Sequence, residues 1–294
     1  MIANHAARAW RLAFCALAAA AAATVCTAAR AERPRLAEPI NVATYNLRLN
    51  TPDDGANAWP QREAMVKALI QHHALDLVAT QEGLIEQITA LQAMPGWARV
   101  GVGRDDGAQA GEHAAIFYRT ARFKLERHGD FWLSATPDKP SISWDSRCCN
   151  RLTSWAQFKD LLTGRSFFVS SSHFDHEGVV SRRESAKLLV ARLAQLAGKL
   201  PVLGMGDFNA VPSSEPVAIM KAAYRDAFDV SETPPYGPVG TFNGFKWDAP
   251  AADRIDYIWL TPKVRVLKYG VLTDSQQGRY PSDHFPVVVR LLVD

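Results

Sequence analysis

Short apolar runs separated by polar stretches recur along the chain and predict β-strands. These runs lie at residues 40–45, 75–80, 114–118, 167–171, 202–205, 255–260 and 285–292. Some predicted strands follow one another with no helical pattern between them, as the run at 114–118 and a further strand at 122–132 do. Strands in that arrangement indicate mixed sheets, and therefore an α+β fold rather than a simple parallel wound sheet.

Two segments repeat their apolar residues at helical spacing, at residues 61–72 and 181–199. The second begins with Ser181, and Glu184 follows three positions later, which fits a capping box at the start of a helix. No internal repeat or low-complexity linker interrupts the chain after the first thirty residues. We therefore expect one catalytic domain over residues 32–294, acting as a monomer.

The first 31 residues have the layout of a secretory signal peptide. Arg8 and Arg11 precede an apolar run at residues 12–24, and a small-x-small cleavage pattern ends at Ala31. That run is short for a membrane span, so a retained N-terminal anchor is the less favoured alternative. No later segment is apolar enough to cross a membrane, and we expect an exported protein, periplasmic or secreted.

Charge argues against a chain that coats nucleic acid. The full sequence has 33 Lys and Arg against 30 Asp and Glu, a formal net charge of +3. Removal of residues 1–31 takes away three arginines and no acidic residue, so the remaining charges balance. No extended basic nucleic-acid surface is therefore expected. After cleavage only Cys148 and Cys149 remain, and a vicinal disulfide and two free thiols are both open.

Polar side chains stand at the ends of nearly all the predicted strands, at residues 46, 81–82, 171–176, 206–209, 254–257 and 282–284. Each group alone is an ordinary turn former. Strand ends converge on one edge of a sheet, however, so the groups together predict a single site rich in carboxylate, amide and imidazole. Such a set suits a hard divalent cation and phosphoryl chemistry.

These blocks resemble the endonuclease/exonuclease/phosphatase superfamily. The sequences Gly206-Asp207-Phe208-Asn209 and Ser282-Asp283-His284-Phe285-Pro286 are specific in combination. The other blocks follow the family's order, and residues 240–245 and 278–281 resemble a secreted bacterial branch of it. The resemblance implies a four-layer α/β/β/α sandwich of two packed mixed sheets with helices outside.

The resemblance also implies roles for individual residues. Glu82 would be the principal ligand of Mg²⁺, which Mn²⁺ could replace, with Asn46 beside it and Asp283 completing the metal or histidine environment. Asp207 would orient or deprotonate the attacking water, and Asn209 would hold that water or a phosphate oxygen. His173 and His284 would bind the phosphate and stabilise its charge, with Asp256 hydrogen-bonded to His284.

Four further residues are candidates for substrate contact. Arg48 stands where some family nucleases carry an acidic second metal ligand, which favours one metal ion, and either phosphate contact or a solvated charge fits it. His113 precedes a strand, with a site role and a surface loop equally open. Asp175 and His176, with His173, form part of a zinc-hydrolase motif whose leading histidine is Ser171 here. They are expected to shape the phosphate pocket instead.

The sequence thus predicts an exported Mg²⁺-dependent phosphoester hydrolase, with a phosphodiesterase favoured. The substrate is left open among a small molecule such as a phosphorylated sugar, a nucleic acid and a lipid head group, so a secreted nuclease or a sphingomyelinase-like enzyme stays an alternative. A binding module that has lost catalysis is the alternative of another class. A zinc hydrolase built on His173, Asp175 and His176 is the third.

Overall fold

Two six-stranded β-sheets pack face to face in the computed structural model, which describes residues 38–294. The predicted signal peptide at residues 1–31 lies outside the described residues. The first sheet has the order β11 (Val264–Val271), β12 (Val287–Val293), β1 (Ile40–Asn46), β2 (Leu77–Gln81), β4 (Ile116–Arg119), β3 (Trp97–Val100). The second has the order β5 (Phe123–Trp132), β6 (Leu152–Asp160), β7 (Ser166–His173), β8 (Val202–Asp207), β10 (Asp256–Leu260), β9 (Arg225–Asp226).

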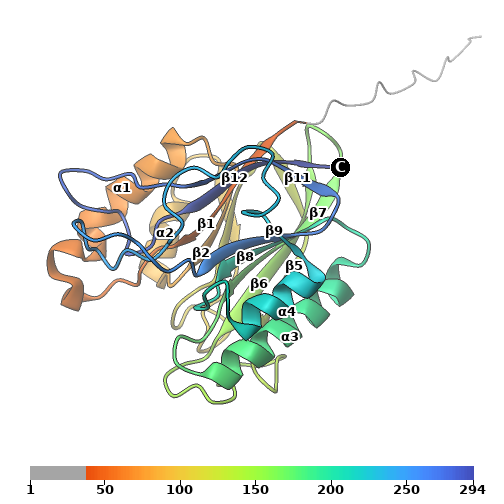
Figure 1. The fold of residues 1–294 in the computed structure, drawn as a ribbon, viewed down its shortest axis with the longest axis horizontal. Coiled ribbons are helices and arrows are strands. Elements are labelled where there is room, and N and C mark those ends of the chain that lie inside the picture. The colour runs from red at the N-terminus through yellow and green to blue at the C-terminus, as the bar shows by residue number, and fades with distance from the viewer. Residues whose placement is uncertain (1–37) are drawn as a thin grey trace, which may run out of the picture. The chain divides into compact units, whose positions relative to one another are not determined.

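Helices cover the outer face of each sheet (Figure 1). Helices α1 (Trp59–His72) and α2 (Ile85–Gln92) lie on the first sheet, and a 3-10 helix, η1 (Pro52–Asn57), precedes α1. Helices α3 (Val179–Ala197) and α4 (Glu215–Ala223) lie on the second sheet. The four-layer α/β/β/α sandwich implied by the resemblance is confirmed.

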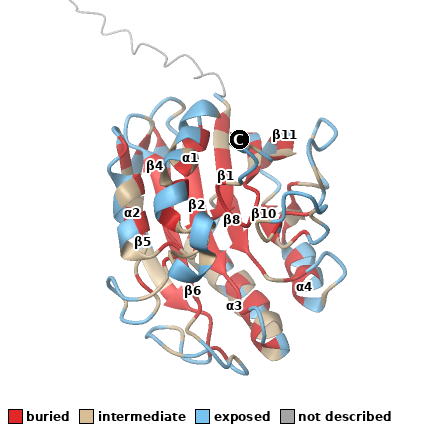
Figure 2. Cartoon of the chain, turned by 90° about the vertical axis from the view of Figure 1, so that its left-hand side faces the viewer, coloured by how far each residue is buried: buried red, intermediate tan, exposed pale blue. Residues whose placement is uncertain are grey.

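Alternating side chains along each strand separate the inter-sheet core from the helix-facing cores. In β1, Ile40 and Val42 join the core between the sheets, whereas Ala43 and Tyr45 pack toward α1. In β10, Ile258 faces the other sheet. Figure 2 shows the result, with buried strands between helices that are buried on one side only.

The register of the strands brings the polar strand ends together. Strands β1 and β2 are parallel and end side by side, with Asn46 opposite Gln81. Strands β7 and β8 are also parallel and place His173 opposite Asp207. Strand β10 runs antiparallel to β8, so that Asp256, its first residue, also lies opposite Asp207.

The predicted capping box at Ser181 is wrong. Helix α3 begins two residues earlier, after Gly178, and Ser181 is a buried residue inside its first turn. The first turn is capped instead by Asp145 from a distant loop, whose carboxylate accepts hydrogen bonds from Val180 N at 3.0 Å and Ser181 N at 2.6 Å. The capping acceptor comes from tertiary structure, so local spacing does not reveal it. Among residues 38–294, no helix combines the length and apolar character needed to cross a membrane.

Candidate active site

Asn46, Glu82 and Asp207 form the centre of the polar cluster. The Asn46 side-chain amide donates hydrogen bonds to Glu82 Oε1 at 3.0 Å and to Asp207 Oδ2 at 2.9 Å. Its carbonyl oxygen accepts from Arg48 N at 2.9 Å instead of facing the carboxylates. Asn46 therefore ties Glu82 of the first sheet to Asp207 of the second, as a donor to both.

His284 lies between two carboxylates. Its Nδ1 is 2.9 Å from Asp256 Oδ2, and its Nε2 is 3.8 Å from Asp207 Oδ2. Burial alone would lower the pKa of His284, but the charges of Asp256 and Asp207 outweigh it and raise that pKa well above its usual value. The imidazole is therefore a cation at neutral pH. Burial, followed by the charge of Asp256, in turn raises the pKa of Asp207.

His173 has the opposite electrostatic environment. Its Nε2 lies 3.7 Å from Asp207 Oδ2, but Arg151 Nη1 lies 3.1 Å from Nδ1 of its ring. Burial and the Arg151 charge lower the pKa of His173 to about 3. The two histidines that the resemblance pairs thus differ, because His284 is cationic whereas His173 is neutral.

Three residues in the cluster adopt left-handed backbone conformations. Arg48, Glu82 and Asn209 have φ of 56°, 62° and 46°. Such conformations are unfavourable for residues other than glycine and persist where the surrounding structure holds them. Each follows the end of a strand, where the turn directs the side chain toward the shared edge. The Glu82 carboxylate is held there by Leu49 N, at 3.1 Å from Oε2.

Asn209 and Asp283 complete the predicted group, and Arg48 borders it. Asn209 N donates a hydrogen bond to Asp207 Oδ1 at 2.9 Å. Asn209, Asp283 and Arg48 all line the same cavity. Burial, with the Glu82 charge adding to it, raises the pKa of Asp283 to about 6. Arg48 makes a two-pronged ion pair with Asp54, its Nε and Nη2 each 2.9 Å from a carboxylate oxygen.

The other three predicted substrate residues lie in different places. His176 is half exposed and lines the cavity. Asp175 is fully buried outside the lining, where it accepts hydrogen bonds from Ser146 Oγ and from the backbone N–H groups of Glu177 and Gly178, just before α3. His113 is also buried and outside the main cavity, with its Nδ1 3.1 Å from Gly83 O, so that it packs behind Glu82.

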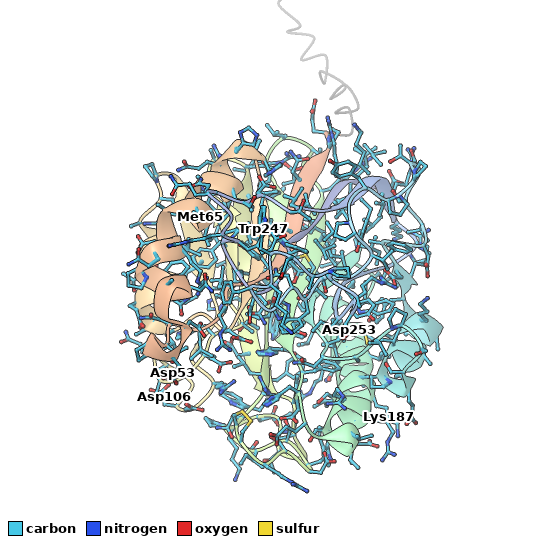
Figure 3. All side chains as sticks on the ribbon, turned by 60° about the vertical axis from the view of Figure 1, so that its left-hand side comes forward. Asp53, Met65, Asp106, Lys187, Trp247 and Asp253 are labelled. Atoms are coloured by element: carbon cyan, nitrogen blue, oxygen red, sulfur yellow. A yellow bond between two sulfur atoms is a disulfide. The ribbon has the colours of Figure 1, made fainter. Side chains whose placement is uncertain are left out.

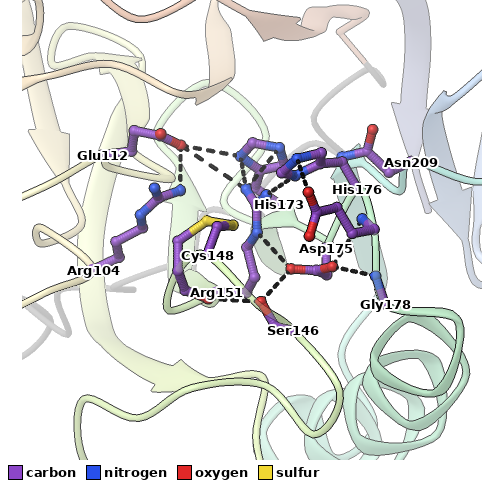
Figure 4. Close-up of a disulfide and its surroundings, with 12 residues drawn as sticks. Arg104, Glu112, Ser146, Cys148, Arg151, His173, Asp175, His176, Gly178 and Asn209 are labelled. Atoms are coloured by element: carbon purple, nitrogen blue, oxygen red, sulfur yellow. Dashed lines mark hydrogen bonds and ion pairs between the residues drawn. A yellow bond between two sulfur atoms is a disulfide. The ribbon is translucent and has the colours of Figure 1, made fainter.

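Arg151 is the site residue that the sequence reasoning missed. It is 3% exposed, and its guanidinium lies between the two histidines, with Nη2 2.7 Å from His176 Nδ1 (Figure 4). Its Nε is 3.6 Å from Asp175 Oδ2, and its Nη1 is 4.0 Å from Glu112 Oε2. A cation between His173 and His176 is incompatible with a zinc ion held by those imidazoles.

A disulfide between Cys148 and Cys149 borders the same region. Cys149 lines the cavity, while Ser146 Oγ lies within hydrogen-bond distance of both Cys149 O and Asp175 Oδ2, at 3.2 Å and 2.6 Å (Figure 4). Of the two alternatives left open by the sequence, the structure has the vicinal disulfide.

The residues present fit a divalent metal ion. Glu82 and Asp207 are close enough to offer oxygen ligands to one ion, and His173 is within reach of the same point. Burial disfavours the charge of Asp207, which a cation would compensate. Oxygen ligands of this kind match Mg²⁺ or Mn²⁺.

A cavity of about 510 Å³ opens onto this cluster. Its lining includes Glu82, Asp207 and His284 and also several apolar residues. The arrangement offers a carboxylate base, a cationic imidazole and a neutral imidazole in one cavity. Those groups are suited to the addition of water to a phosphoester.

Comparison with known proteins shows the family to which the chain belongs. The profile described as "Endonuclease/Exonuclease/phosphatase family" matches residues 43–284. A solved family protein from Bacteroides thetaiotaomicron has 39% sequence identity and a TM-score of 0.84, over 88% of this chain and 99% of that one. A mannosyl-6-phosphatase from the same organism has 40% identity and a TM-score of 0.82, over 86% and 99%.

A third solved structure, a family protein from Bacteroides vulgatus, has 34% identity and a TM-score of 0.83, over 87% of this chain and 100% of that one. The comparison with curated proteins finds no match. The family match spans every strand-end block that forms the site. The chain therefore belongs to the endonuclease/exonuclease/phosphatase family and is a hydrolase of phosphoester bonds.

Proposed function

We propose that this chain is an exported, Mg²⁺-dependent phosphatase that hydrolyses phosphomonoesters. The observation that carries the proposal is the Asn46 amide, which joins Glu82 and Asp207 across the two sheets beside the His284–Asp256 pair. Glu82 would be the principal ligand of the metal ion, beside Asp207. When bound, the ion would withdraw charge from the phosphate and favour ionisation of water.

Asp207, His284 and His173 would have separate roles in the reaction. Asp207, whose pKa is raised, would take a proton from the attacking water while Asn46 and Asn209 N orient its carboxylate. The cationic His284 would stabilise the charge that develops on the phosphoryl oxygens. His173, kept neutral by burial and by the charge of Arg151, would donate one hydrogen bond to the phosphate without adding a second full charge.

Charge in the cavity argues against a polynucleotide, the one diester substrate that would need several phosphate contacts. The lining has two arginines, but Arg48 pairs with Asp54, and Arg151 lies against Glu112 and Asp175. Among the described residues of the lining, no further Lys or Arg is present to hold a second phosphate. A polynucleotide needs several such contacts. The name of the 40%-identical relative, a mannosyl-6-phosphatase, supports a monoester over the diester that the sequence suggested.

The test is hydrolysis of p-nitrophenyl phosphate and bis(p-nitrophenyl) phosphate in Mg²⁺, Mn²⁺, Zn²⁺ and chelator. We expect the monoester to react faster, with activity dependent on Mg²⁺ or Mn²⁺. Glu82→Ala and Asp207→Ala should each lose about 10²-fold or more of kcat. Glu232→Gln, on an exposed surface pair, is the matched control.

Three results would contradict the proposal. Faster hydrolysis of the diester would restore the phosphodiesterase that the sequence favoured. Activation by Zn²⁺ with full activity in Glu82→Ala would indicate the zinc site instead, and metal binding with no hydrolysis of either ester would indicate a binding module.

Export is a separate part of the proposal. It rests on the sequence pattern of residues 1–31. Expression of the full chain in a bacterial host, followed by N-terminal sequencing of the protein from periplasm and medium, should give a chain beginning at Glu32. Recovery of an uncleaved chain with the membrane fraction would indicate a retained anchor.

A further inference from the structure

Three apolar residues among those that line the cavity form what we call its apolar wall. They are Val211, Phe242 and Ile255. Val211 is 38% exposed and Phe242 is 41% exposed. Phosphate chemistry makes no use of such a surface, because phosphate oxygens bind cations and hydrogen-bond donors. The wall is therefore placed to contact the part of the substrate that is not phosphate.

The Phe242 ring is fixed beside the reacting centre. Its backbone forms a β-bridge with His284, and its N–H donates to Asp253 O at 3.2 Å. The ring packs edge-on against the His284 imidazole, with centroids 5.1 Å apart. Gly244 has a φ of 57°, in the left-handed region that favours glycine, and this turn places the chain beside the ring.

Asp253 adds a polar group to the same wall. Asp253 is exposed and lines the cavity, and its backbone carbonyl accepts hydrogen bonds from the N–H groups of Thr241 and Phe242. Within residues 38–294, no cation pairs with the Asp253 carboxylate, so this carboxylate is available as a hydrogen-bond acceptor for a ligand. A carboxylate here repels a second phosphate and favours a neutral group that carries hydroxyls.

An exposed aromatic ring beside a hydrogen-bond acceptor matches one chemistry in particular. A pyranose ring has an apolar face of C–H groups and a rim of hydroxyl donors. We propose that Val211, Phe242, Ile255 and Asp253 form a sugar subsite, and that Phe242 determines the preference of the enzyme for hexopyranose phosphates over acyclic ones. This proposal rests on the phosphatase function proposed above.

The decisive quantity is a ratio of specificities. We would measure kcat/KM for glucose, mannose and galactose 6-phosphates, for the acyclic glycerol 1-phosphate and for adenosine 5′-monophosphate, with Mg²⁺. The ratio of interest is kcat/KM for the preferred hexose phosphate divided by kcat/KM for glycerol 1-phosphate. Phe242→Ala should lower this ratio about tenfold, mainly by raising KM for the hexose phosphate. Asp253→Asn should lower the same ratio.

Trp247 provides the matched control. It is another exposed aromatic residue, at 52% exposure, but it lies outside the cavity lining and well apart from Asp253 (Figure 3). Trp247→Ala should keep the wild-type ratio. An equal loss on every substrate in Phe242→Ala would overturn the proposal and make Phe242 a positioning residue for His284. A preference for the nucleotide over all hexose phosphates would also overturn it.

A binding measurement separates this proposal from the phosphatase function. If the wild type hydrolyses no monoester, the phosphatase function fails. Calorimetric titration of hexose 6-phosphates into Asp207→Asn, with and without Phe242→Ala, then still decides the subsite. Binding that weakens about tenfold when the ring is removed supports it, whereas binding that is absent or insensitive to the ring refutes it.

Discussion

Replacement of Asp256 by asparagine tests the proposed role of His284. Asp256 and His284 are almost fully buried, at 1% and 4% exposure, and His284 Nδ1 lies 2.9 Å from Asp256 Oδ2. The asparagine side chain would have nearly the shape of the aspartate but no charge. Burial alone lowers the pKa of His284, and Asp256 is the largest influence that raises it. The Asp256→Asn variant should therefore have a neutral imidazole over much of the neutral range.

The expected loss follows from what a cation adds at a buried phosphoryl group. One preorganised charged donor contributes roughly 10²–10³ in kcat, which corresponds to about 3–4 kcal/mol at 1.36 kcal/mol per tenfold. We expect a loss of that size, with KM changed much less. Because the active form is protonated at His284, wild-type activity should persist as pH rises until the raised pKa is reached. In Asp256→Asn the alkaline limb should move to lower pH.

The assay is the pH dependence of kcat and of kcat/KM with p-nitrophenyl phosphate at saturating Mg²⁺. Unfolding in urea should be measured on the same preparations, so that lost activity is separated from lost structure. Asp130→Asn is the matched control, because Asp130 is a partly buried carboxylate on β5 that is outside the cavity lining. Near-wild-type kcat with an unmoved alkaline limb in Asp256→Asn would refute the assignment of a cationic His284.

Three further outcomes are expected. Burial raises the pKa of Asp130, so its ionised form costs stability as pH rises, and urea titrations should show Asp130→Asn gaining stability over the wild type as pH rises through that pKa. Asp145→Ala should lower the urea midpoint near neutral pH, whereas Glu184→Ala should change it little. Burial would raise the pKa of Asp145, but hydrogen bonds from the start of α3 lower it to about 2, so the Asp145→Ala difference should vanish as pH falls toward that value. Replacing Cys148 and Cys149 by serine should raise KM severalfold with a smaller change in kcat, because Cys149 lines the cavity. Reduction of the wild-type disulfide should have the same effect, and steady-state kinetics of both preparations would check it.

Strand ends were the most informative feature of the sequence. Apolar runs fix where strands stop, and parallel neighbours such as β1 and β2 must end at one edge. The convergence of Asn46, Glu82 and Asp207 could therefore be predicted before any geometry was known. The orientation of the Asn46 amide could not be predicted, because it depends on Arg48 N and on two carboxylates from different sheets.

Arg151 shows why the rest was missed. It directly precedes β6, a strand that the apolar pattern did not predict, because Thr153 and Ser154 are polar although they are buried. A residue just before an unpredicted strand could not be grouped with the other strand-end residues. Its partners, Glu112 and His176, come from separate loops. Long-range pairing of this kind leaves no local signal in a single sequence.

The site depends on the packing between the sheets, because its central hydrogen bonds cross from one sheet to the other. Asn46 belongs to β1, whereas Asp207 and Asp256 belong to β8 and β10. Burial of several carboxylates without compensation is unfavourable, and it raises the pKa of Asp207 and of Asp283. The apolar core between the sheets, which includes Val42 and Met205, offsets that cost by holding the strand ends in register. A divalent cation bound at this edge, as we propose, would offset the same unfavourable burial. Stability and catalysis are thus opposed at this edge, and the inter-sheet core is what allows the catalytic arrangement to persist.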